Sequence, residues 1–353
     1  MHDRILPHPI GAGLDTGVSL LSDNEHDATL AYRQLQPHDI LAAVEALGFA
    51  CSGQFLALNS YENRVYQVGI EDGAPLVAKF YRPARWSDAA ILEEHEFALQ
   101  LAAGEIPVVA PLRHAERTLH THGLFRFAVY PNRGGRAPEL DDMALLNQLG
   151  RFVARIHALG ETRAFAHRPQ VDLASYGVAS RDYLLQHGCI PADVETAYAT
   201  LCEHLFAAIE ACYARAGAVQ QLRVHGDLHP SNVLVRDTEL HIVDLDDARS
   251  GPAVQDLWMF LSGDRLEQTP QLAELLEGYG EFRDFDAREL HLIEALRTLR
   301  IMHYAAWLAR RWQDPAFQVA FPWFNSQRYW EQHILALREQ VALMQEEPLQ
   351  WRP

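Results

Sequence analysis

Cysteine and long apolar runs are both scarce in this chain of 353 residues. The four cysteines form no C-x-x-C pair and have no ligand-like spacing with histidine, so we expect free thiols that pack as small apolar side chains. No apolar run approaches the length of a membrane span, and no secretory signal pattern opens the chain. These absences predict a cytoplasmic protein without a membrane partner.

Basic residues are also few, since 30 Lys and Arg face 47 Asp and Glu, for a formal net charge of −17. General nucleic-acid binding depends on clustered cations that neutralise phosphates, so we expect no nucleic-acid partner. A nucleotide ligand is still compatible with this charge, because a few local cations and Mg²⁺ can hold a triphosphate. The hydrophobic content of 48% and the length suit a globular monomer of two lobes that share a cleft.

The first part of the chain predicts a small lobe rich in strands. Residues 1–30 mix Pro, Gly, His and Asp without periodicity and are expected to form a flexible extension. Residues 31–132 are assigned to the N-terminal lobe. Its expected elements are a helix within 36–48, a hairpin of the runs 63–70 and 74–81, a helix over 87–104 and a second hairpin within 113–131.

The rest of the chain, residues 133–353, predicts a larger and mostly helical lobe. The strand pattern stops at "PNRGGR" (131–136), where we expect a hinge. One short hairpin at about 233–245 interrupts the helices. The expected helical runs are 143–160, 194–217, 253–263, 271–282 and 287–312. The fold class is therefore α+β, with a small β-rich N-terminal lobe and a larger, mostly helical C-terminal lobe.

The stretch "RVHGDLHPSNVLVRD" (223–237) places polar side chains where burial usually selects Val and Ile. Asp227 and Asn232 lie on the loop that enters the hairpin, and Asp244 emerges near its far end. Singly, each could be a turn residue or could end a strand. Together they fit phosphoryl transfer, with one carboxylate as acceptor of a hydroxyl proton and the amide and second carboxylate as oxygen ligands of Mg²⁺.

Such a site also needs a cation on a strand and an acid on the following helix. Lys79 interrupts the apolar run "LVAKF" at the position expected of a lysine that contacts the α- and β-phosphates of ATP. Its expected partner is Glu94 or Glu96, which point to roughly opposite sides of the helix. We favour Glu96, because it shares a face with Leu92 and Leu99, and we expect Glu94 to be solvated.

These motifs resemble a known group of enzymes. "HGDLHPSNVL" looks like the catalytic loop of the aminoglycoside phosphotransferase and choline kinase superfamily, which is related to the eukaryotic protein kinases. From about residue 33 the chain is similar to one branch, the bacterial stress response kinase A (RdoA-type) proteins. That similarity rests on "LNSYENRVYQV", "VAKFYRPARW", "ILEEHEFALQLA", "VDLDDARSGPAVQDLWM" and "WLARRWQDPAFQVAFPW".

The resemblance implies a protein-kinase-like two-lobe fold and a cytoplasmic Ser/Thr kinase that depends on ATP and Mg²⁺ and acts in stress response. It implies that Asp227 is the proton acceptor and that Asn232 and Asp244 hold the metal, with Asp244 counted as catalytic. By the same resemblance Ser60 lies at the ATP phosphates, and Asp256 braces the catalytic loop from the following helix. The remaining roles are a loop support for His225 and a phosphate contact for Asn63.

The chain departs from protein kinases in two ways. No G-x-G-x-x-G lies in the small lobe, so "NSYENR" must approach the phosphates through polar side chains and backbone N–H groups. No long activation segment follows Asp244, and this favours a small hydroxyl-bearing acceptor such as an aminoglycoside, choline or an amino alcohol. The similarity over the whole chain favours a protein acceptor, which is the reading we adopt.

Two further alternatives remain open at this stage. Asp246, Asp247 and Arg249 form either an ion-paired turn or a contact for a basic or hydroxyl-bearing acceptor. A pseudokinase that binds nucleotide without turnover is disfavoured, because the lysine, both aspartates and the asparagine of the expected site are all present.

Overall fold

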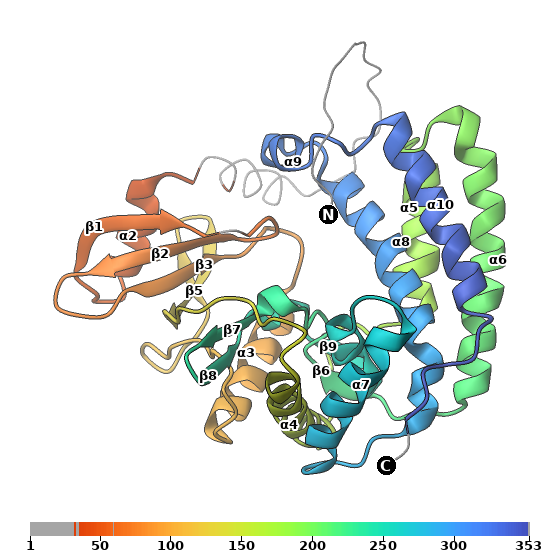
Figure 1. Cartoon of the computed structure of the whole chain (residues 1–353). Coiled ribbons are helices and arrows are strands. Elements are labelled where there is room, and N and C mark those ends of the chain that lie inside the picture. Colours follow the sequence, from red (N-terminus) through yellow and green to blue (C-terminus); the bar gives the residue numbers. More distant parts are fainter. Residues whose placement is uncertain (1–31, 33–34, 59, 352–353) are drawn as a thin grey trace.

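A five-stranded antiparallel sheet and a large helical region make up the computed structural model (Figure 1). It describes residues 32, 35–58 and 60–351, so the predicted extension at 1–30 lies outside the described residues. The sheet has the order β1-β2-β3-β5-β4 and forms the N-terminal lobe. Its strands are β1 (Cys51–Ala57), β2 (Arg64–Ile70), β3 (Leu76–Phe80), β4 (His120–His122) and β5 (Phe125–Pro131). The predicted α+β two-lobe class is confirmed.

Two helices complete the N-terminal lobe, α2 (Pro37–Glu45) and α3 (Asp88–Ala103). The predicted start of α3 is confirmed, since the Ser87 hydroxyl accepts the N–H of Ala90 at 3.2 Å and so caps the helix. Both predicted hairpins are present as β2–β3 and β4–β5. Strand β1 was not anticipated, because its exposed residues lack the alternation of apolar and polar side chains that marks a half-buried strand.

The helical region holds seven α-helices among its described residues, and most of the runs predicted as helical are present. They are α4 (Met143–Gly160), α5 (Ala179–Gln186), α6 (Ala192–Ala216), α7 (Arg265–Gly280), α8 (Ile293–Arg311), α9 (Pro315–Ala320) and α10 (Gln327–Leu343). The backbones of α4 and α7 touch, since a Cβ on Gly150 would lie 2.0 Å from the Leu275 carbonyl oxygen. No described helix is both long and apolar enough to cross a membrane.

Two small sheets and several short helices lie between the long helices. The strands are β6 (Leu222–Val224) with β9 (Arg249–Gly251), and the predicted hairpin β7 (Val233–Arg236) with β8 (Glu239–Ile242). The short helices are the π-helix Leu173–Val178 and the 3₁₀ helices Pro230–Asn232, Leu245–Asp247, Ala253–Asp256, Trp258–Phe260 and Ala287–Leu292. This hairpin and β6 hold the candidate site between them.

The helix predicted over 253–263 is wrong, because this segment forms two 3₁₀ helices. The N–H of Val254 donates to the Glu289 carboxylate at 2.8 Å, and Gln255 donates to the Gly226 carbonyl oxygen at 2.8 Å. These long-range contacts hold the segment in its tighter turns, and no local sequence signal reports them.

Candidate active site

The loop between β6 and β7 is held from beneath by a buried carboxylate. Asp256 is fully buried and accepts the backbone N–H groups of His225 at 2.7 Å and Gly226 at 2.9 Å. Its Oδ2 also accepts a hydrogen bond from His157 Nε2 at 3.1 Å, a partner that the sequence analysis missed. The buried carboxylate therefore lies where the resemblance placed a brace for the catalytic loop.

Gly226 is needed where this loop turns. Its φ is +83°, and a Cβ there would lie 2.3 Å from the Asp247 carbonyl oxygen. Beside it, His225 Nε2 donates to the Val243 carbonyl oxygen at 2.9 Å, while His225 Nδ1 accepts the N–H of Asp227 at 3.4 Å. His225 thus links the loop to the segment before Asp244, in keeping with the support expected of it.

Asn232 lies between the two aspartates of the predicted site. Its Nδ2 donates to the backbone carbonyl oxygen of Asp227 at 2.9 Å, and its backbone carbonyl oxygen accepts the N–H of Val243 at 3.0 Å. Val243 directly precedes Asp244, so the hairpin brings Asn232 beside Asp244 although twelve positions separate them in sequence. The structure therefore gathers Asp227, Asn232 and Asp244 in one place.

Lys79 joins this group from the N-terminal lobe. Its Nζ lies 2.8 Å from Asp244 Oδ1 and 3.2 Å from Asp246 Oδ1. Burial alone would lower the pKa of Lys79, but the two carboxylates outweigh it and the pKa is raised well above its usual value. Asp244 has a left-handed backbone (φ 62°, ψ 65°) and a side chain that is 48% exposed, so it keeps a face open to solvent.

The helix face chosen for the acidic partner of Lys79 is wrong. Glu94 is buried, whereas the Glu96 side chain is 45% exposed and accepts a hydrogen bond from Gln100 Nε2 at 2.8 Å. Burial raises the pKa of Glu94 to about 7, against the opposing effect of Lys79. Leu92, used to choose the face, is itself 46% exposed, so the face it shares with Glu96 points outward.

The cluster that follows Asp244 is an ion-paired turn. Arg85 from the N-terminal lobe contacts Asp246 and lies 2.9 Å from Asp247, and Arg249 pairs with Asp247 as well. Burial would raise the pKa of Asp246, but Arg85 and Lys79 lower it to about 2. Because the carboxylates of Asp246 and Asp247 are already paired with arginines, this finding favours the ion-paired alternative over an acceptor contact.

The loop "NSYENR" reaches the site differently from what was expected. The Asn63 side chain is buried and its Oδ1 accepts the N–H of Arg82 at 3.1 Å, so it does not extend toward phosphates. Its neighbour Glu62 instead pairs with Arg82, Arg85 and Arg311. Ser60 is half-buried at the start of this loop.

Among the described residues no cluster of three or more His, Cys, Asp or Glu could hold a metal ion. The oxygen donors of Asn232 and Asp244 fit Mg²⁺, which binds through one or two protein oxygens together with phosphates and water. Asn232 donates through Nδ2, and no hydrogen bond within the described chain uses its Oδ1. The residues present therefore suit a nucleotide-bound magnesium ion better than a metal held by protein alone.

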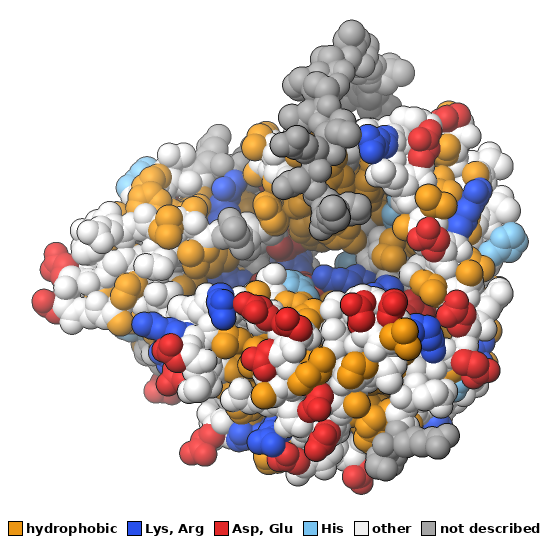
Figure 2. Space-filling model, in the orientation of Figure 1, with side chains coloured by type: hydrophobic (Ala, Val, Ile, Leu, Met, Phe, Trp, Pro, Cys, Tyr) orange, Lys and Arg blue, Asp and Glu red, His pale blue; other side chains and the backbone are white. Residues whose placement is uncertain are grey.

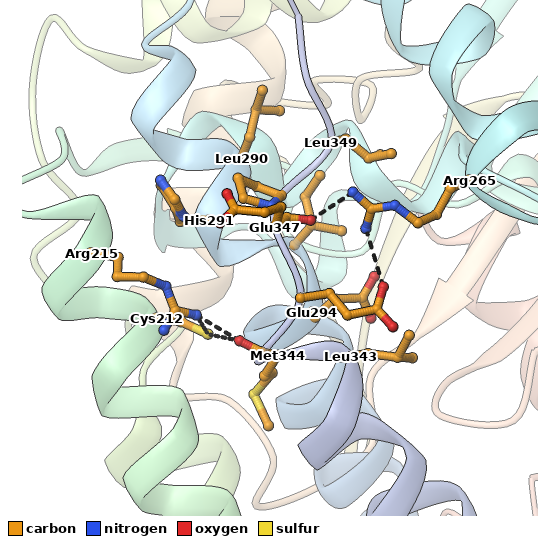
Figure 3. Close-up of a pocket in the computed structure, with 13 residues that line it drawn as sticks. Cys212, Arg215, Arg265, Leu290, His291, Glu294, Leu343, Met344, Glu347 and Leu349 are labelled. Atoms are coloured by element: carbon orange, nitrogen blue, oxygen red, sulfur yellow. Dashed lines mark hydrogen bonds and ion pairs between the residues drawn. The ribbon is translucent and has the colours of Figure 1, made fainter.

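A separate pocket lies in the helical region, between α6, α7, α8 and the C-terminal segment (Figure 3). Arg215 donates to the Met344 carbonyl oxygen and Arg265 to that of Glu347, each at 2.6 Å. Both guanidinium groups thus hold the C-terminal segment in place. Neither Lys79 nor the acids of the catalytic loop line this pocket, so it is distinct from the candidate site.

Comparison with known sequences agrees with this geometry. Residues 54–293 match the model of the phosphotransferase enzyme family. Stress response kinase A of Escherichia coli is 44% identical over 328 residues, which cover 93% of this chain and 99% of that protein. A protein named serine/threonine protein kinase RdoA, of Salmonella typhimurium, is 42% identical over the same shares.

Solved structures of similar fold are kinases with small-molecule acceptors in their names. An amicoumacin kinase has a TM-score of 0.67 at 19% identity and covers 87% of this chain and 93% of its own. A microcompartment-associated aminopropanol kinase has a TM-score of 0.63 at 17% identity, with 86% and 95% covered. At these identities the likeness concerns the fold. The sequence relatives place the chain more closely: it belongs to the phosphotransferase enzyme family and, within it, to the stress response kinases A.

Proposed function

We propose that this protein transfers the γ-phosphate of ATP to a Ser or Thr hydroxyl of protein acceptors in a Mg²⁺-dependent reaction of the bacterial stress response. The observation that carries the proposal is the contact between Lys79 and Asp244, 2.8 Å apart and contributed by different lobes, beside the loop that holds Asp227. Phosphoryl transfer depends on such an arrangement of cation, metal ligands and proton acceptor around one point. The name of the RdoA relative supports a protein acceptor.

Each residue of the site has a distinct task in this proposal. Lys79 binds the nucleotide phosphates from the N-terminal lobe, which we assign to residues 31–132. Asp227 orients the acceptor hydroxyl and takes its proton, while Asp256 keeps the loop in position from beneath. Mg²⁺, when held by Asn232 and Asp244, neutralises phosphate charge. Residues 133–353 supply the acceptor side, and we place the reaction in the cytoplasm.

A second candidate is a kinase of small molecules. Residues 245–256 after Asp244 comprise two 3₁₀ helices and the three-residue strand β9, so no long segment is available there as a platform for a peptide. The structural relatives named above are also kinases of small acceptors. We rank this candidate second, because the relatives at 42–44% identity are closer in sequence than those of known fold at 17–19%.

Incubation with γ-labelled ATP and Mg²⁺ distinguishes the candidates. The acceptors are the chain alone, generic proteins, and a panel of aminoglycosides, choline and amino alcohols. Label in protein supports the main proposal, while label confined to one small molecule overturns it in favour of the second candidate. Nucleotide binding without label in any acceptor would identify a pseudokinase.

A further inference from the structure

An arginine that the sequence analysis did not single out contacts the proposed proton acceptor. Arg300 Nη1, from α8, donates to Asp227 Oδ1. The Arg300 side chain is 37% exposed and that of Asp227 is 25% exposed, so both are partly accessible to solvent. Within the described part of the chain, Asp227 is the one ion-pair partner that Arg300 has. Most of the five N–H donors of its guanidinium are therefore available to a ligand.

Arg300 begins one face of α8 that runs toward the loop "NSYENR". Tyr304 and Trp307 follow at intervals of four and three residues, so the three side chains share a face. The rings of Tyr304 and Trp307 are stacked at 5.6 Å, and Trp307 Nε1 donates to the Glu62 carboxylate in "NSYENR". Tyr304 is 40% exposed. This α8 face thus contacts both the loop that holds Asp227 and the loop "NSYENR".

The surroundings of Asp227 leave Arg300 as its permanent cation. His229 Nε2 lies 3.6 Å from Asp227 Oδ2, a longer distance than a hydrogen bond, and an imidazole loses its charge near neutral pH. Figure 2 shows an opening between the two lobes with both basic and acidic side chains near its edge. A guanidinium keeps its charge at any pH at which the protein is folded.

The acidic groups near the base are, in contrast, already engaged by cations. Asp244 pairs with Lys79, and Asp246 and Asp247 pair with Arg85. A basic acceptor would have to displace one of these arginine or lysine partners. An acidic acceptor would meet a guanidinium with donors to spare, so charge complementarity favours the acidic one.

From this juxtaposition we propose that the acceptor is a Ser or Thr flanked by an acidic residue, and that Arg300 binds the flanking carboxylate while Tyr304 packs against the peptide. This inference rests on the proposed protein kinase function and names its substrate class. Arg300 holds Asp227 Oδ1 and the acceptor carboxylate at once, which leaves Asp227 Oδ2 for the hydroxyl. Arg300 is thus a specificity-determining residue that sets the distance between acceptor and base.

The test compares synthetic peptides that carry one Ser between Glu residues, between Lys residues or between Gln residues. We measure kcat/KM for each peptide with wild type, R300Q and R300E, and use the ratio of the Glu peptide to the Lys peptide within each variant. That ratio cancels any effect of the substitution on Asp227 itself. The control is R338Q, since Arg338 is an exposed residue on α10. A thermal melt verifies that each variant is folded.

We expect wild type and R338Q to favour the Glu peptide by about tenfold. In R300Q the ratio should fall to about one through a higher KM for the Glu peptide, and in R300E it should fall below one. An unchanged ratio in folded R300Q, or a wild type indifferent to peptide charge, overturns the inference while the kinase proposal stands. Label in small molecules with none in any peptide overturns both proposals.

Discussion

Asp227→Asn separates the proposed chemical role of this side chain from a structural one. Asn keeps the shape of Asp and leaves the backbone carbonyl that Asn232 contacts unchanged. It removes the basicity that a proton acceptor requires, and it removes the charge that faces Arg300. We expect the affinity for Mg²⁺–ATP to be unchanged, because the proposal assigns nucleotide binding to Lys79, Asn232 and Asp244.

The structure sets the expected size of each effect. The Asp227 and Arg300 side chains are 25% and 37% exposed, so their ion pair is screened by water and its loss should cost no more than about 1 kcal/mol of unfolding free energy. Loss of a group that transfers a proton typically lowers the rate by ~10²–10⁴-fold. The rate of transfer should therefore collapse in a protein that is nearly as stable as wild type. Turnover falls without weaker nucleotide binding, because the lost interaction belongs to the transition state.

Three measurements test this prediction: phosphate transfer from labelled ATP, calorimetric titration with Mg²⁺–ATP, and the melting temperature. Asp237→Asn serves as the matched control, since Asp237 is an exposed turn residue with φ of 55°, a conformation that Asn adopts readily. We expect the control to retain transfer, binding and stability. Transfer at the wild-type rate by folded Asp227→Asn would refute the role proposed for Asp227 and leave it as a turn residue.

Three further predictions concern the remaining acids. Glu94→Gln should lower the steady-state rate of ATP turnover, because Glu94 is buried near Lys79. Glu96→Gln should stay near wild type, because the Glu96 side chain is 45% exposed. The opposite ranking of the two variants would contradict the geometry. Asp244→Ala should abolish the Mg²⁺ dependence of nucleotide affinity, and calorimetry that finds ATP binding indifferent to both Mg²⁺ and the substitution would exclude this metal site. Burial raises the pKa of Glu94 and of Glu289 to about 7 from 4.5, so each group stabilises the fold fully below pH 4.5 and loses that contribution as the pH rises through 7. The loss in free energy of unfolding is about 3 kcal/mol for each group. Glu289→Gln should therefore reduce the fall in free energy of unfolding, measured with denaturant, as the pH rises through this range. A pH dependence equal to that of wild type would show that Glu289 does not titrate as expected.

The ion pairs between the lobes explain how this acidic chain builds its site. Two cations of the N-terminal lobe form these pairs. Lys79 pairs with Asp244 and Asp246, and Arg85 pairs with Asp246 and Asp247. Breaking one partner of a buried pair leaves an uncompensated charge, which is costly, so these contacts favour one relative placement of the segments that carry them. Lys79 and Asp244, to which we assign phosphate and metal binding, are thereby held together.

Local sequence signals were sufficient for much of the fold and for the core of the site. Ser87 caps α3 and Gly48 ends the turn after α2 with φ of +85°, because capping and left-handed turns depend on a few neighbouring residues. Lys79 stood out because it interrupts an apolar run, and Asp227 and Asn232 because they lie together on the loop that enters a predicted hairpin. Features of this kind depend on residues that are close together in the sequence.

Contacts between distant segments were beyond any local signal. Glu94 and Glu96 lie two positions apart on one helix, and only the packing of α3 against the rest of the protein turns Glu94 inward and leaves Glu96 in solvent. Arg300 meets Asp227 across 73 positions, and Arg85 meets Asp246 across 161. Side chains so far apart in sequence become neighbours only when the lobes and α8 pack together. The residue types of the candidate site could therefore be predicted from the sequence, whereas the ion-pair partners of these residues are decided by the folded arrangement.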